Sequence, residues 1–174
     1  MINFEDGISE PENWFRQAWE MYEASKTVYQ ALADQERPRT EQDNYRRVGL
    51  MKGAMLMLGL SAENALKGAL VFQSKPDVSK GKMSSGHFHE KPHDLIEVAE
   101  KLDLDLTGKQ KDLLVRLTLF VQWASKYQVP LREYEYINAQ GKLTLTYPSD
   151  YAMVEELILA LQRNCGFNGE SGWA

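Results

Sequence analysis

The sequence predicts an all-α protein, an up-and-down bundle of about five helices with a small β-hairpin inserted before the last helix. Over most of the chain, apolar residues recur every three or four positions, which is the period of an amphipathic helix. Only between Arg132 and Tyr147 is the period nearer two, as in a strand. The length of 174 residues is that of one domain, so residues 1–174 are expected to share one core.

Two long helices are expected first, separated by an interruption at Pro38. From Pro11 to about Ala33, one stripe of side chains recurs at helical spacing: Phe15, Ala18, Tyr22, Ser25 and Tyr29. Thr40 followed by Asp43 is typical of a helix N-cap with an acid in the first turn. A second helix therefore begins there, and its pattern extends to Phe72, roughly 48 Å at 1.5 Å per residue.

The second helix carries Gly49, Gly53 and Gly59 among Ala, Leu and Met. Each glycine costs about 1 kcal/mol of helix propensity, so we expect another backbone to pack close against this face. The Gly/Ala/Met helix is also where the sequence predicts a homodimer contact. The apolar run from Gly53 to Ala62 has 10 residues. A membrane span needs ~20, so no membrane contact is expected.

The chain after this helix is divided by turn-forming residues. Residues 74–91 are rich in Ser, Gly and Lys without any period, which is typical of a mobile loop. A third helix is expected over 92–102, because Pro92 suits its first turn. A fourth is expected from Lys109 to about Tyr127 on the spacing of its apolar residues.

The predicted hairpin precedes the last helix. Asn138 to Gly141 are expected to form its turn, flanked by apolar side chains at alternating positions: Tyr134, Tyr136, Leu143, Leu145 and Tyr147. Ser149 or Asp150 then caps the last helix, and Gly166 ends it. Residues 166–174 are expected to be a flexible tail.

The composition is that of an ordinary globular protein, with 26% charged and 43% apolar residues. The formal net charge of -5 argues against a surface that binds nucleic acid broadly, so any such contact must be focal. The single cysteine, Cys165, excludes an internal disulfide, and the first residues lack the basic start and apolar run of a secretory signal. We therefore expect a cytoplasmic protein, and no cofactor is predicted.

Glu63 and Lys67 are the most informative pair in the chain, because they lie four residues apart within the Gly/Ala/Leu/Met helix. That spacing places both side chains on one face. A buried charge without a partner is costly, so both are expected to have partners. Three roles stay open: the two side chains pair with each other, they orient His93 across the bundle, or they contact a ligand.

The order of the motifs resembles the HEPN family, the helical domains named for higher eukaryotes and prokaryotes and for nucleotide binding. A long helix with Glu63-x-x-x-Lys67 is followed by a variable loop, by His93-Asp94-Leu95 opening a short helix, and by a helix that ends in Lys126-Tyr127 before Pro130. The resemblance covers about Trp14 to Pro130. It implies a helical bundle, a homodimer, a nucleotide or RNA as ligand, and a role in toxin–antitoxin or phage-defence systems beside a nucleotidyltransferase partner.

The chain departs from the ribonuclease members of that family. They carry an Arg followed four to six residues later by a His, which places a cation and a proton-transfer group beside the scissile phosphate. Here Arg116 is followed at those offsets by Phe120, Val121 and Gln122, and all three histidines lie between His87 and His93. Lys126 also stands where the family more often has Arg, which matters for binding phosphate.

Three hypotheses about function follow. The first is a non-catalytic HEPN-like module that binds a nucleotide, an RNA or a partner protein. The second is a HEPN-type ribonuclease with a displaced constellation, in which His93 handles the proton and Arg116, Lys126 or Lys67 holds phosphate. The third is a protein-interaction dimer without a ligand. The absence of the Arg–His motif favours the first, so enzyme activity is not predicted.

The candidate ligand-binding residues are Glu63, Lys67, Lys126, Tyr127, Lys80 and Lys82. The last two belong to the 74–91 loop, where they and Lys75 would meet a phosphate backbone as a clamp. The segment from His87 to Asp94 also has the residue types of a zinc site. Its spacing matches no common motif, so no metal is predicted, and whether His87, His89 and His93 bind one stays open.

Overall fold

The structure is a computed structural model that describes residues 3–78, 81–83, 86–88, 91 and 93–173. Along these residues seven α-helices occur, with a π-helical turn between the fifth and sixth. They are α1 (Phe4–Ser9), α2 (Pro11–Ala33), α3 (Glu41–Gln73), α4 (Leu95–Lys101), α5 (Gly108–Leu119), η1 (Phe120–Ala124), α6 (Glu133–Ala139) and α7 (Ser149–Asn164). The prediction of an all-α protein is confirmed.

The predicted helices correspond to α2, α3, α4, α5 with η1, and α7, while α1 and α6 are additional. Local signals set several boundaries. The side chain of Thr40 accepts from the backbone of Asp43 and that of Asp43 from the backbone of Thr40, a capping box at the start of α3. Thr107 and Gln110 form the same box at α5, and Asp94 caps α4.

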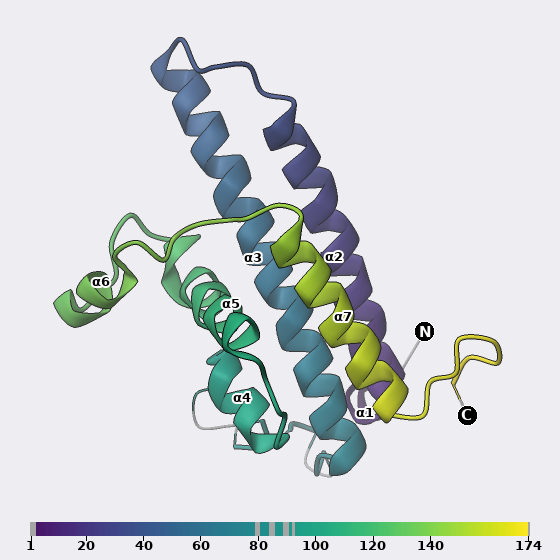
Figure 1. The fold of residues 1–174 in the computed structure, drawn as a ribbon. Coiled ribbons are helices and arrows are strands. Elements are labelled where there is room, and N and C mark those ends of the chain that lie inside the picture. Colours follow the sequence, from purple (N-terminus) through teal and green to yellow (C-terminus); the bar gives the residue numbers. More distant parts are fainter. Residues whose placement is uncertain (1–2, 79–80, 84–85, 89–90, 92, 174) are drawn as a thin grey trace.

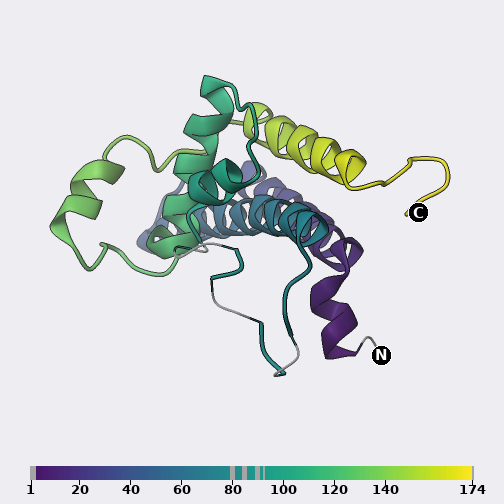
Figure 2. The same ribbon diagram turned by 90° about the horizontal axis from the view of Figure 1, so that it is seen from below.

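Helix α3 is the centre of the bundle. It runs antiparallel to α2, with α7 against this pair and α4 and α5 on another side of α3 (Figure 1). The view from below shows the same arrangement around α3 (Figure 2). The core is built from fully buried side chains of these helices, among them Phe15, Met55, Leu58, Leu66, Leu117 and Ile158. Because α3 contacts all these helices, polar residues in its second half such as Ser61, Glu63 and Lys67 are buried.

The close packing expected at the glycines of α3 occurs at Gly59. A Cβ atom placed there would lie 2.6 Å from Val121 Cγ2 and 3.3 Å from the carbonyl oxygen of Leu117, so only glycine lets this part of the chain approach. A Cβ at Gly49 would meet nothing within 4 Å. Gly59 therefore packs within the chain and is not available to a second copy.

The predicted β-hairpin is wrong. Residues 133–139 form the helix α6, and no strand occurs in the described segment that follows, up to Tyr147. Ala139 is the buried residue of α6, whereas Tyr134 and Tyr136 are exposed. The alternating tyrosines therefore do not define a buried face. A period of two indicates a strand only where one face of the segment is buried.

The last residues contact the core. The ring centroid of Trp173 lies 5.5 Å from that of Phe15 and 5.3 Å from that of Phe167, and Asn168 forms an isolated bridge with Gly172. By length and composition α3 is apolar enough to cross a membrane. However, 72% of its apolar window is buried inside the protein, as in the core helix of a soluble protein.

Candidate functional site

The candidate site is centred on an ion pair buried along α3. The side chains of Glu63 and Lys67 are 5% and 10% exposed, and Lys67 Nζ donates a hydrogen bond to Glu63 Oε1. Of the three roles left open for the two residues, the pairing with each other is therefore present in the structure. Removing two charges from water is costly, and the pair is favourable only where further hydrogen bonds satisfy the remaining polar atoms.

His93 joins this pair from the segment before α4. The backbone N–H of Leu95 donates to Thr118 Oγ1 on α5 over 3.0 Å, which fixes the start of α4 between α3 and α5. His93 Nδ1 then lies 3.1 Å from Glu63 Oε1, within hydrogen-bond distance when that nitrogen carries a proton. The imidazole is 57% exposed, so it connects a buried carboxylate with the surface.

Only one of the two carboxylate oxygens of Glu63 has hydrogen-bond partners in the described chain. Lys67 Nζ and His93 Nδ1 both lie within hydrogen-bond distance of Oε1, whereas the buried Oε2 has no hydrogen-bond partner among the described residues. The Lys67 ammonium lies 5.0 Å from the ring centroid of Phe88, a favourable cation–π position, and Phe88 packs edge-to-face with Trp14 at 5.1 Å. Glu63, Lys67, Phe88 and His93 are called the Glu63 cluster below.

The cluster combines a buried acceptor and a buried aromatic ring with an exposed imidazole. A buried acceptor without a donor costs about 1–3 kcal/mol, so a ligand that donates to Oε2 would recover that energy. The Lys67 ammonium is already engaged with Glu63 and Phe88. The chemistry that fits an acceptor without a donor is recognition of a hydrogen-bond donor.

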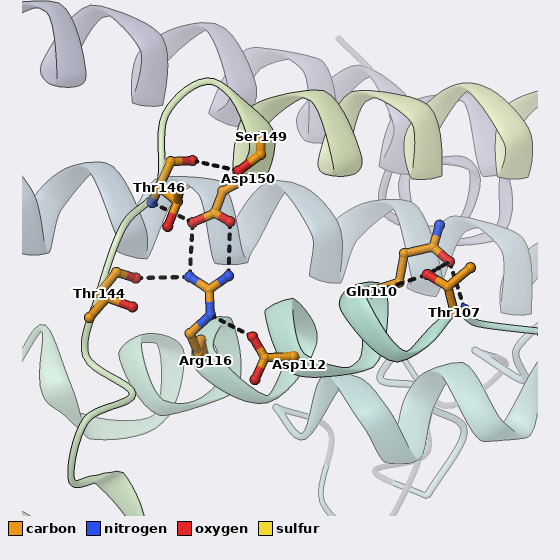
Figure 3. A network of polar contacts seen from close by, with 8 residues as sticks. All are labelled: Thr107, Gln110, Asp112, Arg116, Thr144, Thr146, Ser149 and Asp150. Carbon is orange, nitrogen blue, oxygen red and sulfur yellow. Dashed lines mark hydrogen bonds and ion pairs between the residues drawn. The ribbon is translucent and has the colours of Figure 1, made fainter.

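Arg116, predicted as a catalytic residue, lies in a different network (Figure 3). Its Nη1 and Nη2 both donate to the carboxylate of Asp150 over 2.8 Å, Nη1 also donates to the carbonyl of Thr144 over 3.0 Å, and Nε donates to Asp112 over 3.1 Å. The hydrogen bond from Arg116 to Asp150 raises the pKa of the guanidinium. The network fastens the start of α7 to α5.

The structure does not bring the two predicted catalytic residues together. Arg116 and Thr118 are two positions apart on α5, about 200° around the helix. Thr118 contacts the start of α4 beside His93, so Arg116 points toward α7 instead. None of the hydrogen bonds found for Arg116 in the described part of the chain reaches the Glu63 cluster.

Lys126 and Tyr127 are also separate from the Glu63 cluster. The carbonyl of Tyr127 accepts from Lys52 Nζ over 3.5 Å, and Lys126 Nζ donates to the carbonyl of Gln122 over 3.3 Å. Lys52 precedes Glu63 by 11 residues of α3, about 16 Å along the helix axis. Lys126 and Tyr127 thus lie apart from Glu63 and Lys67.

The loop residues are described in part. Lys80 and His89 lie outside the described residues, and Lys82 is exposed. Lys75 Nζ lies 3.3 Å from Glu10 Oε1 at the surface. Within the described ranges, no three His, Cys, Asp or Glu side chains gather as metal ligands.

The pKa values of His87 and Cys165 are also shifted from their ordinary values. Desolvation, together with the nearby Lys101 ammonium, lowers the pKa of His87. Its Nε2 is buried without a partner among the residues described. Burial raises the pKa of the Cys165 thiol to about 11. That thiol stays protonated near neutral pH, which is unfavourable for a nucleophile.

Sequence reasoning missed Phe88 and the role of Asp150. Phe88 sits in a loop without a period, so no pattern pointed to its contact with Lys67. Asp150 was expected as a helix cap, and at the start of α7 its carboxylate instead pairs with Arg116 from 34 residues earlier. Only the fold brings these two together.

Comparisons of this chain with protein-family models, with curated proteins and with solved structures give no match. The resemblance to the HEPN family stays a prediction from the residues.

Proposed function

We propose that this protein is a non-catalytic HEPN-like module of the cytoplasm that binds a nucleotide or an RNA at the Glu63 cluster. The observation that carries the proposal is the buried Glu63 Oε2, which has no donor in the described chain although it lies beside a half-exposed imidazole. Such an atom is costly to leave unpaired, so it is a preformed acceptor for a ligand.

The chemistry of a nucleotide supplies the missing donor. Amino and ring N–H groups on a base edge donate hydrogen bonds to carboxylates. The exposed ring of His93 offers a face on which a base can stack. Lys82 is exposed on the neighbouring loop and can meet phosphate. Binding here would be focal, as the acidic net charge of the chain requires.

The ribonuclease hypothesis is supported less well. It needs a cation beside His93 to hold the phosphate. Arg116 is engaged with Asp150, and the ammonium of Lys67 is engaged with Glu63 and Phe88. By its resemblance to the HEPN family, the proposed setting is a toxin–antitoxin or defence system with a nucleotidyltransferase partner.

The first test is the material bound to the protein after purification at low salt. A raised ratio of absorbance at 260 and 280 nm, with a nucleotide or RNA fragment in the mass spectrum of the denatured extract, is expected. Titration calorimetry with the identified nucleotide then gives its affinity. Protein without bound material, and without affinity for any of the common nucleotides or a short single-stranded RNA, would contradict the proposal.

A double variant locates the site. Glu63→Leu/Lys67→Met removes both charges together, because removing Lys67 alone would leave the Glu63 carboxylate buried with only His93 beside it. We expect it to fold and to lose at least about tenfold in affinity, the value of one hydrogen bond to a charged group. The matched control is Glu12→Leu/Arg16→Met, an exposed pair at the same spacing with 2.9 Å between its charged groups. Equal affinity in both variants would exclude the Glu63 cluster.

A cleavage assay separates binding from catalysis. Wild-type protein and His93→Ala are incubated with labelled RNA, and neither is expected to produce fragments. Cleavage by the wild type that disappears in His93→Ala would replace the binding proposal with the ribonuclease hypothesis.

A further inference from the structure

A groove of about 560 Å³ lies where α2 ends and α3 begins. Its third wall is the segment between α6 and α7, which crosses α3 to reach the start of α7 (Figure 1). Six apolar side chains from these three parts of the chain line it: Leu32, Ala33, Val48, Met51, Leu143 and Leu145. Sites for small molecules have volumes of about 300–1,000 Å³ and mostly apolar walls, so the groove has the size and the lining of such a site.

The groove is separate from the Glu63 cluster. Arg47, which also lines the groove, precedes Glu63 by 16 residues of α3, about 24 Å along the helix axis. A small molecule in the groove would therefore not reach the Glu63 cluster, and its binding is independent of the nucleotide binding proposed above.

Two contacts fix the third wall of the groove. The carbonyl of Thr144 accepts from Arg116 Nη1 over 3.0 Å. The ring of Tyr147 stacks on that of Tyr29 of α2, with the ring centroids 4.5 Å apart and the ring planes at 14°. The groove is therefore preformed, and a ligand would not have to order its wall on binding.

Arg47 is the charged member of the groove lining in the described chain, and its guanidinium pairs with no other described residue. Asp43, one helical turn earlier, is at the spacing of an ion pair, but its carboxylate accepts from the backbone N–H of Thr40 over 3.0 Å in the capping box. Asp34, at the end of α2, accepts from Gln30 Nε2 over 2.7 Å. The positive charge of the groove is therefore available to an anion.

The groove combines this one cation with apolar walls. Arg47 is exposed, whereas Met51, Leu143 and Leu145 are partly buried and pack against the core. A guanidinium binds a carboxylate through two parallel hydrogen bonds, and a single cation matches a single negative charge. Apolar walls favour a hydrocarbon chain, because its burial removes apolar surface from water.

We propose that the groove binds a monocarboxylic acid with an alkyl chain of medium length. Arg47 holds the carboxylate, and the apolar side chains of α2, α3 and the segment before α7 cover the alkyl chain. The site differs from the Glu63 cluster in the sign of the charge that it accepts, since the Glu63 cluster presents an acceptor and the groove presents donors.

Titration calorimetry with four small molecules tests the two parts of the ligand. Octanoate is expected to bind at least about fivefold more tightly than octanol, which has the same chain and no charge. Decanoate should bind about tenfold more tightly than octanoate, because each buried methylene adds to the affinity. Acetate, which has the charge without the chain, should show no binding. All are used below the concentrations at which they form micelles.

Three variants locate the ligand in the groove. Arg47→Gln should lower the affinity for octanoate to that for octanol and leave the affinity for octanol unchanged. The matched control is Arg46→Gln, which removes the same charge from an exposed neighbour that is not among the lining residues found in the described chain, and it should bind octanoate like the wild type. Ala33→Trp fills the groove from the exposed last residue of α2 and should abolish binding of both molecules.

Circular dichroism of each variant checks that the helices are retained, and nucleotide binding should be the same in all three because none alters the Glu63 cluster. Equal affinities of the wild type for octanoate and octanol would overturn the proposal. So would an equal loss in Arg46→Gln and Arg47→Gln, or a folded Ala33→Trp that binds octanoate like the wild type. If a second copy of the chain occupies the groove instead, the wild type will sediment as a dimer that octanoate neither binds nor dissociates, and the proposal fails.

Discussion

Two clusters of buried charge lie on different sides of the bundle and differ in how completely they are satisfied. In the Arg116 network, both oxygens of Asp150 accept from the guanidinium, and Oδ2 also accepts from the backbone of Thr146 over 2.8 Å. All three guanidinium nitrogens donate. In the Glu63 cluster, one carboxylate oxygen takes both partners and the other takes none in the described chain.

This difference indicates that the two buried ion pairs have different roles. Four of the five guanidinium N–H groups of Arg116 donate to groups of the chain, and these hydrogen bonds join α5 to α7. The Glu63 cluster has an unpaired acceptor beside an exposed imidazole, and the proposed binding rests on these two groups. Variants of the two clusters should therefore separate stability from binding.

The largest effect is expected from Arg116→Met. Asp150 is 1% exposed and would remain buried without its charged partner, so the free energy of unfolding should fall by about 3–5 kcal/mol. Urea denaturation measures this change. Arg116→Met/Asp150→Asn removes the orphaned charge and keeps an acceptor for Thr146, so it should recover much of the loss. A single variant within about 0.5 kcal/mol of wild type would show that the network is not structural.

A smaller loss of stability is expected from Lys67→Met. After this substitution Glu63 keeps His93 as a neighbour. Because one of its oxygens already lacks a donor in the wild type, fewer hydrogen bonds are lost than in Arg116→Met, and the free energy of unfolding should fall by about 1–3 kcal/mol. The same urea denaturation compares it with Arg116→Met. A loss as large as that of Arg116→Met would remove the distinction between the two clusters.

His93→Ala should affect binding and not stability. The imidazole is 57% exposed, and surface substitutions of this kind change the free energy of unfolding by about 0.5 kcal/mol or less. Loss of its contact with the ligand should weaken nucleotide binding severalfold by calorimetry. Unchanged affinity together with a clear loss of stability would assign His93 to the fold instead.

The smallest effect is a dependence of stability on pH at His87, beside Phe88 of the Glu63 cluster. Burial and the Lys101 ammonium lower the pKa of His87 in the folded state below the ordinary 6.5. The unfolded chain then binds the proton more readily, so this contribution to stability is present above pH 6.5 and is lost as the pH falls through the folded pKa. Thermal melts of wild type and His87→Gln between about pH 7.5 and 5 measure it. An equal decrease in both proteins would assign the dependence to other groups.

The sequence predicted most where its signals are local. The cap at Thr40 and the helical spacing of apolar residues are properties of a few neighbouring positions, and the main helices follow them. Helix α6 was missed because its apolar residues are exposed, so their spacing reports no buried face. The pairing of Glu63 with Lys67 was predictable because four residues make one helical turn.

By itself, the sequence determined an all-α chain and the boundaries of its long helices, and it placed Glu63 and Lys67 on one helix face, because hydrogen bonds and contacts within a helix turn decide these features. Only the tertiary structure decided that Arg116 reaches Asp150, that Phe88 covers Lys67, and that Glu63 Oε2 is left unpaired. The reason is physical: these contacts join residues distant in sequence, and packing of whole helices around α3 sets which of them meet.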